Sequence, residues 1–117
     1  MQHKLHEASA KEFLSDAHNE HSAVCWNVCS SYYTRNGEGI VDDTKADIDA
    51  TLRIQDCVRS VAIEFDAYGQ DVSVEYMNKR IQKVQRMIDQ LETFKNELKE
   101  GYEKAISFNK SEFNNGE

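Results

Sequence analysis

The stretch MNKRIQKVQRMIDQLETFKNELKEGYEKA, residues 77–105, decides the fold that this sequence predicts. Its apolar residues recur in alternating steps of four and three, which predicts one long amphipathic, coiled-coil-like helix over about residues 73–106. Only Lys95 breaks the stripe, and Met87 and Phe94 widen it. Because an isolated helix leaves such a stripe uncovered, we expect self-association, with a dimer as the first expectation. The residues expected to carry it are Ile81, Val84, Ile88, Leu91 and Leu98.

Upstream of this stretch, the spacing of apolar residues predicts two shorter helices. Ser9 and Glu12 have the spacing of a capping box, followed by apolar residues at steps of three and four over about residues 10–34. A second stripe covers about residues 44–67. The expected fold is therefore all-α, a single domain over residues 1–117 built as a three-helix bundle or helical hairpin, with residues 107–117 frayed. Alternation around residues 60–76 leaves a β-hairpin, and thus an α+β fold, as the alternative.

Composition and charge narrow the classes of function. The chain has 117 residues, no proline, 30% charged residues and a formal net charge of −7. The absence of proline favours helices, and the acidity argues against direct binding to nucleic acid, which needs a basic surface. No apolar window is long enough to span a membrane, and the first residues do not resemble a secretory signal. Three cysteines are an odd number, so we expect a reducing, cytoplasmic environment rather than a disulfide framework.

A possible metal site lies within residues 10–34. His21, Cys25 and Cys29 are metal-ligand types that succeed one another at steps of four, so a helix would place them on one side. One straight helix cannot gather a full ligand set around a single ion, however, and buried cysteines commonly serve as small apolar residues. We therefore expect no metal, no cofactor and no catalytic residues, with these three as weak metal candidates only.

The strongest candidate for a binding surface is the acidic cluster Asp42, Asp43, Asp47 and Asp49. Spaced carboxylates can imitate nucleic-acid phosphates and occupy a basic groove on another protein. Tyr33 and Arg35, residue types common in binding hot spots, precede this cluster beside a glycine-containing loop. The simpler interpretation of the cluster is a solvated, capped helix start.

These observations predict a non-enzymatic, acidic interaction protein, an inhibitor or adaptor that occupies a surface of a partner protein. The partner expected first carries a basic nucleic-acid-binding groove, in which case the chain would be a phage-type inhibitor of a nucleic-acid-handling or defence enzyme. The alternative is an oligomer that binds a small anionic ligand through some of the basic residues Arg35, Arg53, Arg59, Lys79 and Arg80. A metal-dependent helical enzyme ranks third.

Overall fold

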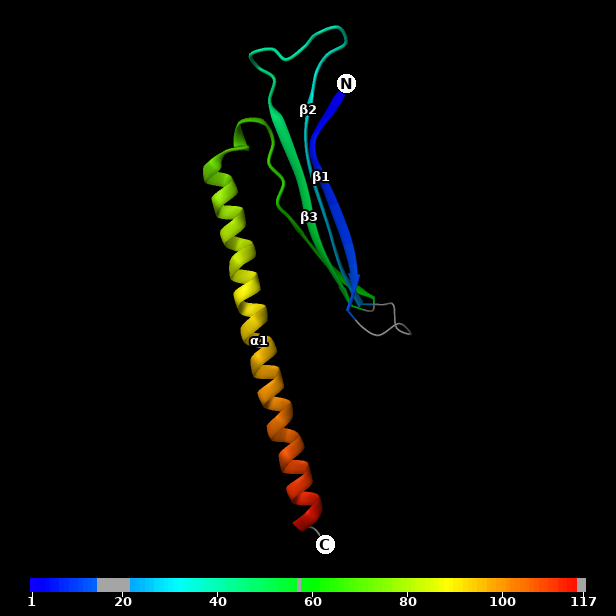
Figure 1. Ribbon diagram of the computed structural model, residues 1–117, viewed down its shortest axis with the longest axis vertical. Helices are drawn as coiled ribbons and strands as arrows, with labels where there is room; N and C mark the ends of the chain where they lie inside the picture. The colour runs from blue at the N-terminus through cyan, green and yellow to red at the C-terminus, as the bar shows by residue number, and fades with distance from the viewer. Residues whose placement is uncertain (15–21, 57, 116–117) are drawn as a thin grey trace. The chain divides into compact units, whose positions relative to one another are not determined.

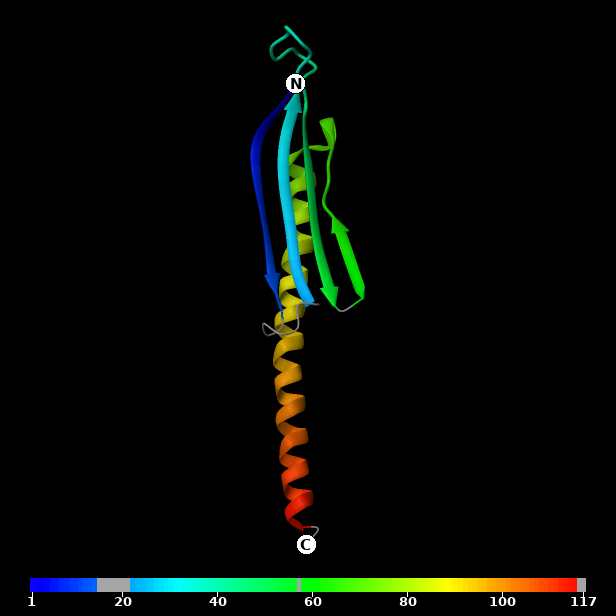
Figure 2. The same ribbon diagram turned by 90° about the vertical axis from the view of Figure 1, so that its right-hand side faces the viewer.

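The computed structural model, which describes residues 1–14, 22–56 and 58–115, combines a β-sheet with one long helix (Figure 1). The strands are β1 (Gln2–Phe13), β2 (Ser22–Tyr33), β3 (Ala46–Asp56) and β4 (Arg59–Glu64). A short 3₁₀ helix, η1 (Gly69–Asp71), and the helix α1 (Val74–Asn115) follow. The sheet is antiparallel in the order β1-β2-β3-β4, so every strand pairs with its neighbour in the sequence, as Figure 2 shows.

The prediction of an all-α fold is wrong, because β1 to β4 occupy the segments predicted as helices over 10–34 and 44–67. The physical reason is that a step of four is also a multiple of two. Val24, Val28 and Tyr32 fit a helical stripe, but they equally lie on one face of a strand. Segment 22–33 is rich in β-branched and aromatic residues, which favour strands.

The alternative hairpin at 60–76 is also wrong in its pairing. Residues 59–64 do form a strand, β4, but it pairs with β3 rather than with residues 72–76. Val74 and Tyr76 belong to the first turn of α1. The third predicted helix is confirmed and is longer than expected, since α1 continues past residue 106 to Asn115.

The two faces of the sheet differ in polarity. Strand register and side-chain alternation place one set of residues together on what we call the apolar face. It comprises Ala8, Ala10, Val24, Trp26, Val28, Ile48, Ala50, Leu52, Ile54, Val61 and Ile63. The opposite, polar face carries residues such as Asn27, Asp49 and Arg53. This segregation is typical of an antiparallel sheet that has one covered and one solvated face.

The chain divides into two compact units, Met1–Met77 and Asn78–Glu117. The first contains the sheet and the first turn of α1, and the second contains the rest of the helix. Within the part of the chain that the structure describes, the only strongly buried apolar side chains are Ala23 and Ala50. A chain of this size normally buries a substantial hydrophobic core, and the described residues of this chain bury only these two apolar side chains strongly.

Candidate interaction surfaces

The first candidate surface is the stripe predicted to self-associate, which runs along α1. We call it the helix stripe and define it as Val74, Met77, Ile81, Val84, Ile88, Leu91, Leu98, Tyr102 and Ala105. Ile81 is 62% exposed and Leu91 is 59% exposed, values that a packed side chain would not have. Contiguous apolar surface of this kind marks an interaction site in a protein that stays in solution.

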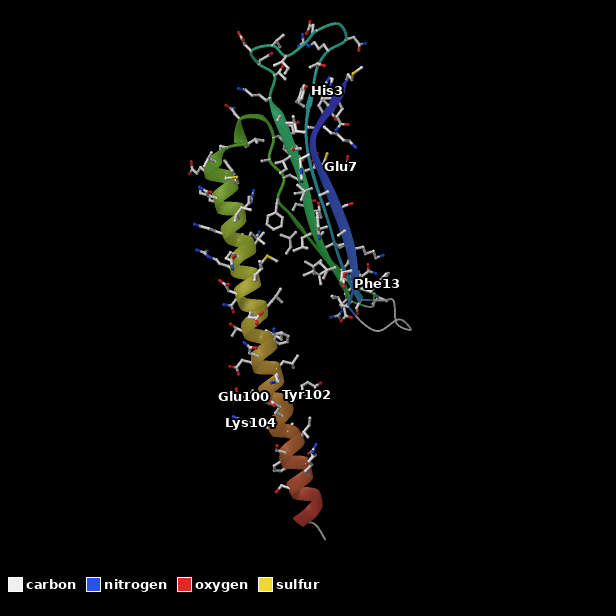
Figure 3. All side chains as sticks on the ribbon, in the orientation of Figure 1. His3, Glu7, Phe13, Glu100, Tyr102 and Lys104 are labelled. Atoms are coloured by element: carbon white, nitrogen blue, oxygen red, sulfur yellow. The ribbon has the colours of Figure 1, made fainter. Side chains whose placement is uncertain are left out.

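The opposite side of α1 carries charged residues paired along the helix. Lys104 Nζ forms an ion pair with Oε1 of Glu100, one helical turn earlier, at 3.0 Å. Figure 3 shows both side chains on one side of the helix and Tyr102 of the helix stripe on the other. Exposed pairs of this kind contribute little to stability, but they keep this side of the helix solvated. The sequence between 73 and 106 therefore folds into a helix with one solvated and one apolar side.

The second candidate surface is the end of the sheet where β2 runs into β3. Loop 34–45 connects these strands and carries exposed Arg35, Asp42 and Asp43, while exposed Tyr33 ends β2. The loop contains two turns, one closed by a hydrogen bond from Glu38 N to Arg35 O and one from Thr44 N to Val41 O. The first turn needs Gly37, whose φ is 77°. No helix starts at Asp42–Asp49; Asp42 and Asp43 lie in the loop.

Asp47 and Asp49, the other two predicted partner residues, lie on the polar face of β3 and accept hydrogen bonds inside the chain. Asp47 Oδ1 accepts from Gly69 N at 2.8 Å, and Asp49 Oδ1 accepts from the Tyr68 hydroxyl at 3.2 Å. These bonds hold the segment after β4 against β3. The four aspartates therefore share one end of the sheet but differ in role, since only Asp42 and Asp43 project from the loop.

Asp66 completes this hydrogen-bond network. The sequence analysis does not predict a role for this residue. Its Oδ1 accepts from the backbone N–H of buried Ala50 at 2.7 Å, and its Oδ2 accepts from the Tyr68 hydroxyl at 3.3 Å. Desolvation, the hydrogen bond to Asp49 and the negative charge of Asp66 raise the pKa of Tyr68 to about 12. The only sequence feature that points to Asp66 is its position after a segment of alternating residues. This feature does not indicate which residues Asp66 binds. We call Asp47, Asp49, Asp66 and Tyr68 the aspartate clasp.

The weak metal candidates do not form a ligand set in the described residues. Cys25 and Cys29 are free thiols on β2, and the i, i+4 spacing separates their Cα atoms by roughly 13 Å along a strand. His21 lies outside the residues that the structure describes. Over residues 1–14, 22–56 and 58–115, no group of three or more His, Cys, Asp or Glu side chains is placed to hold a metal ion. His3 stacks on Tyr32 with ring centroids 4.8 Å apart, a packing role.

The basic residues considered for a small anionic ligand are dispersed. Within the sheet, Arg35 lies at the β2–β3 loop, whereas Arg53 and Arg59 lie toward the other end of β3 and its turn into β4. A shallow depression along α1 is lined by Lys79, Gln82, Lys83, Arg86, Met87 and Gln90. All six residues belong to one helix, so no second wall encloses a ligand as small-molecule sites require.

No helix in the described part of the chain is long and apolar enough to cross a membrane. No family model, no curated protein and no solved structure matches the chain. Its function is therefore inferred from its own residues.

Proposed function

We propose that this chain is a non-enzymatic, self-associating interaction protein, in which α1 builds a homo-oligomer and the acidic sheet unit meets a partner protein. The observation that carries the proposal is the exposure of most large apolar side chains in the described residues, with only Ala23 and Ala50 strongly buried among the apolar residues. Removing apolar surface from water contributes about 25 cal/mol per Å², so a chain without its own core gains stability by associating.

The charge distribution separates the two roles. Residues 1–77 carry six basic and fourteen acidic side chains, a net charge of −8, whereas residues 78–117 carry eight basic and seven acidic, a net charge of +1. The acidity of the chain is therefore confined to the unit that contains the sheet. A partner with a basic groove, such as a nucleic-acid-binding protein, complements this unit electrostatically.

Self-association is tested by measuring molar mass with light scattering during size-exclusion chromatography. We expect an integer multiple of the 13.5 kDa chain mass for the wild type. Leu91→Asp places a charge in the helix stripe and is expected to give a monomer that has lost much of its stability. Gln90→Asp introduces the same side chain beside the stripe and should leave the oligomer intact. A monomeric wild type, or equal behaviour of the two variants, would contradict the proposal.

The partner surface is tested by affinity capture from cells that express the protein. We expect Asp42→Lys combined with Asp43→Lys to lose the captured protein, because both side chains are exposed in the loop and hold no element of the sheet. Asp71→Lys, an equally exposed change outside the loop, is the matched control. Duplex DNA added as a competitor should release the partner if its basic groove is the contact. Equal capture by both variants excludes the loop, and retention in the presence of DNA excludes the groove.

The free thiols Cys25 and Cys29 are compatible with a cytoplasmic site of action, where thiols stay reduced.

A further inference from the structure

The helix stripe contains a second pattern, which concerns the direction in which two helices associate. Numbered as heptads, the stripe divides into a positions and d positions. The a positions are Val74, Ile81, Ile88 and Tyr102, together with Lys95, which interrupts the stripe at a fifth a position; the d positions are Met77, Val84, Leu91, Leu98 and Ala105. Three of the five a residues are β-branched, and both leucines of the stripe are at d.

This division has a geometric meaning. In a parallel pair of helices, a residues meet a residues and d residues meet d residues, and the two layers have different packing geometry. β-branched side chains suit the a layer of a two-stranded parallel coil, and leucine suits its d layer. In an antiparallel pair each layer joins one a to one d residue, so the chain would gain nothing from keeping the two sets distinct.

Lys95 restricts the association further. It occupies the a position between Ile88 and Tyr102, and its ammonium lies 3.0 Å from the carboxylate of Glu92 with 68% of its side chain exposed. A lysine at a single a position lowers stability but specifies register and oligomer size. In a two-stranded coil its long side chain can reach water from the edge of the seam, whereas a wider bundle would enclose it.

We propose that α1 forms a parallel, in-register two-stranded coiled coil with a second copy of this chain, and that Lys95 limits the assembly to two chains. This inference rests on the proposed function, because it names the copy, direction and number of the association proposed there. Its consequence is that both sheet units join the coil at the same end. The dimer then presents two acidic units side by side and can bind a symmetric or repeated partner with avidity.

The direction of the helices is tested with a single cysteine at the d position of residue 105. In a background with Cys25, Cys29 and Cys57 replaced by alanine, Ala105→Cys brings two thiols together only if the helices are parallel and in register. We expect the disulfide-linked dimer to exceed that of Lys104→Cys by about ten-fold in a glutathione redox buffer, because the seam raises the effective thiol concentration. Lys104 pairs with Glu100 on the solvated side and is the matched control position.

The number of chains is tested with Lys95→Leu. We expect this variant to melt at a higher temperature than the wild type and to populate species larger than the dimer, because leucine at an a position lacks the β-branched preference for two strands; Lys95→Arg should behave as the wild type. A wild-type trimer or tetramer, a lower melting temperature for Lys95→Leu, or an oligomer in which Ala105→Cys fails to cross-link would each overturn this inference while leaving self-association intact. A monomeric wild type would overturn both.

Discussion

Asp66 lies in the segment after β4, and its Oδ1 connects this segment to β3 by accepting from the backbone N–H of the buried residue Ala50. Its Oδ2 accepts from the Tyr68 hydroxyl within the same segment. We expect Asp66→Ala to lower the free energy of unfolding by about 1–3 kcal/mol, because the Ala50 N–H then lacks an acceptor while remaining buried. The measurement is urea denaturation followed by circular dichroism at one fixed protein concentration.

Two further variants separate this hydrogen bond from the charge of Asp66. Asp66→Asn keeps an oxygen that can accept from Ala50 N, so it should cost less than Asp66→Ala. Asp42→Ala removes an exposed carboxylate in the loop and should change stability by less than about 0.5 kcal/mol. Equal effects of the alanine changes at positions 66 and 42 would show that the aspartate clasp does not stabilise the sheet.

Tyr68 provides a prediction about pH, because its pKa is raised to about 12 by desolvation, the Asp49 hydrogen bond and nearby carboxylates. A raised tyrosine pKa means that the folded chain favours the neutral phenol. Its contribution to stability is therefore complete below about pH 10, the value for an unfolded chain, and is lost as the pH rises toward 12. Absorbance at 295 nm should show a tyrosinate phase near pH 12 that Tyr68→Phe removes. A phase unchanged by the substitution would contradict the assignment.

The residues of the aspartate clasp also show what the sequence could reveal about the site. The sequence predicts a role for Asp47 and Asp49 because they belong to an acidic cluster. Their hydrogen-bond partners, Gly69 and Tyr68, lie 22 and 19 residues later in the chain. Spacing rules describe neighbours within one element and cannot relate residues across a sheet whose strands have not been recognised. The exposed Asp42 and Asp43, which depend on no distant partner, are the part of the predicted surface that sequence alone could place.

Among the elements, β2 explains why the helix prediction failed over residues 10–34. Its apolar residues satisfy both a period of four and a period of two. In β3, the strict alternation of Ile48, Ala50, Leu52 and Ile54 is the pattern that favours a strand over a helix. The long helix is different, since its steps of three and four cannot be matched by alternation. The sequence therefore predicts α1 reliably, whereas the sheet requires knowledge of which strands pair.

The strand assignment of β2 makes a prediction about its two thiols. Cys25 and Cys29 are separated by about 13 Å along the strand, and a disulfide requires Cα atoms within about 7 Å. We expect peptide mapping by mass spectrometry after mild oxidation to find no Cys25–Cys29 disulfide in folded protein. The same oxidation in guanidinium, where the strand is lost, should produce it. Formation of the bond in the native state would contradict the strand.

Gly101 lies within α1, where a glycine weakens a helix. A Cβ atom added at this position meets no other atom within 4 Å. We expect Gly101→Ala to raise the free energy of unfolding by about 0.5–1 kcal/mol, measured by thermal unfolding of the oligomer. Gly37→Ala is the opposing control, because φ of 77° in the β2–β3 loop disfavours a side chain and should make that variant less stable. A destabilising Gly101→Ala would indicate that another helix approaches closely there.

For the molecule as a whole, the proposed dimer depends on a balance between apolar surface and charge. In this dimer the helix stripe would favour assembly, whereas two sheet units of net charge −8 would repel each other, because a parallel coil brings them to one end. Salt weakens this repulsion, since the screening length falls from about 10 Å at 0.1 M to about 3 Å at 1 M. Added sodium chloride therefore weakens the repulsion between the sheet units, but it does not weaken the apolar contribution of the helix stripe.

We expect the dissociation constant of the dimer, measured by sedimentation equilibrium, to fall as sodium chloride rises from about 0.05 to 0.5 M. The variant with Asp42→Asn and Asp43→Asn removes two negative charges from each sheet unit, so its dimer should be tighter at low salt and less sensitive to salt. Attraction between opposite charges would produce the reverse dependence. A dissociation constant that rises with salt would therefore indicate that ion pairs hold the chains together, as in an antiparallel pair that sets the basic residues 79–86 against the acidic residues 97–103 of its copy.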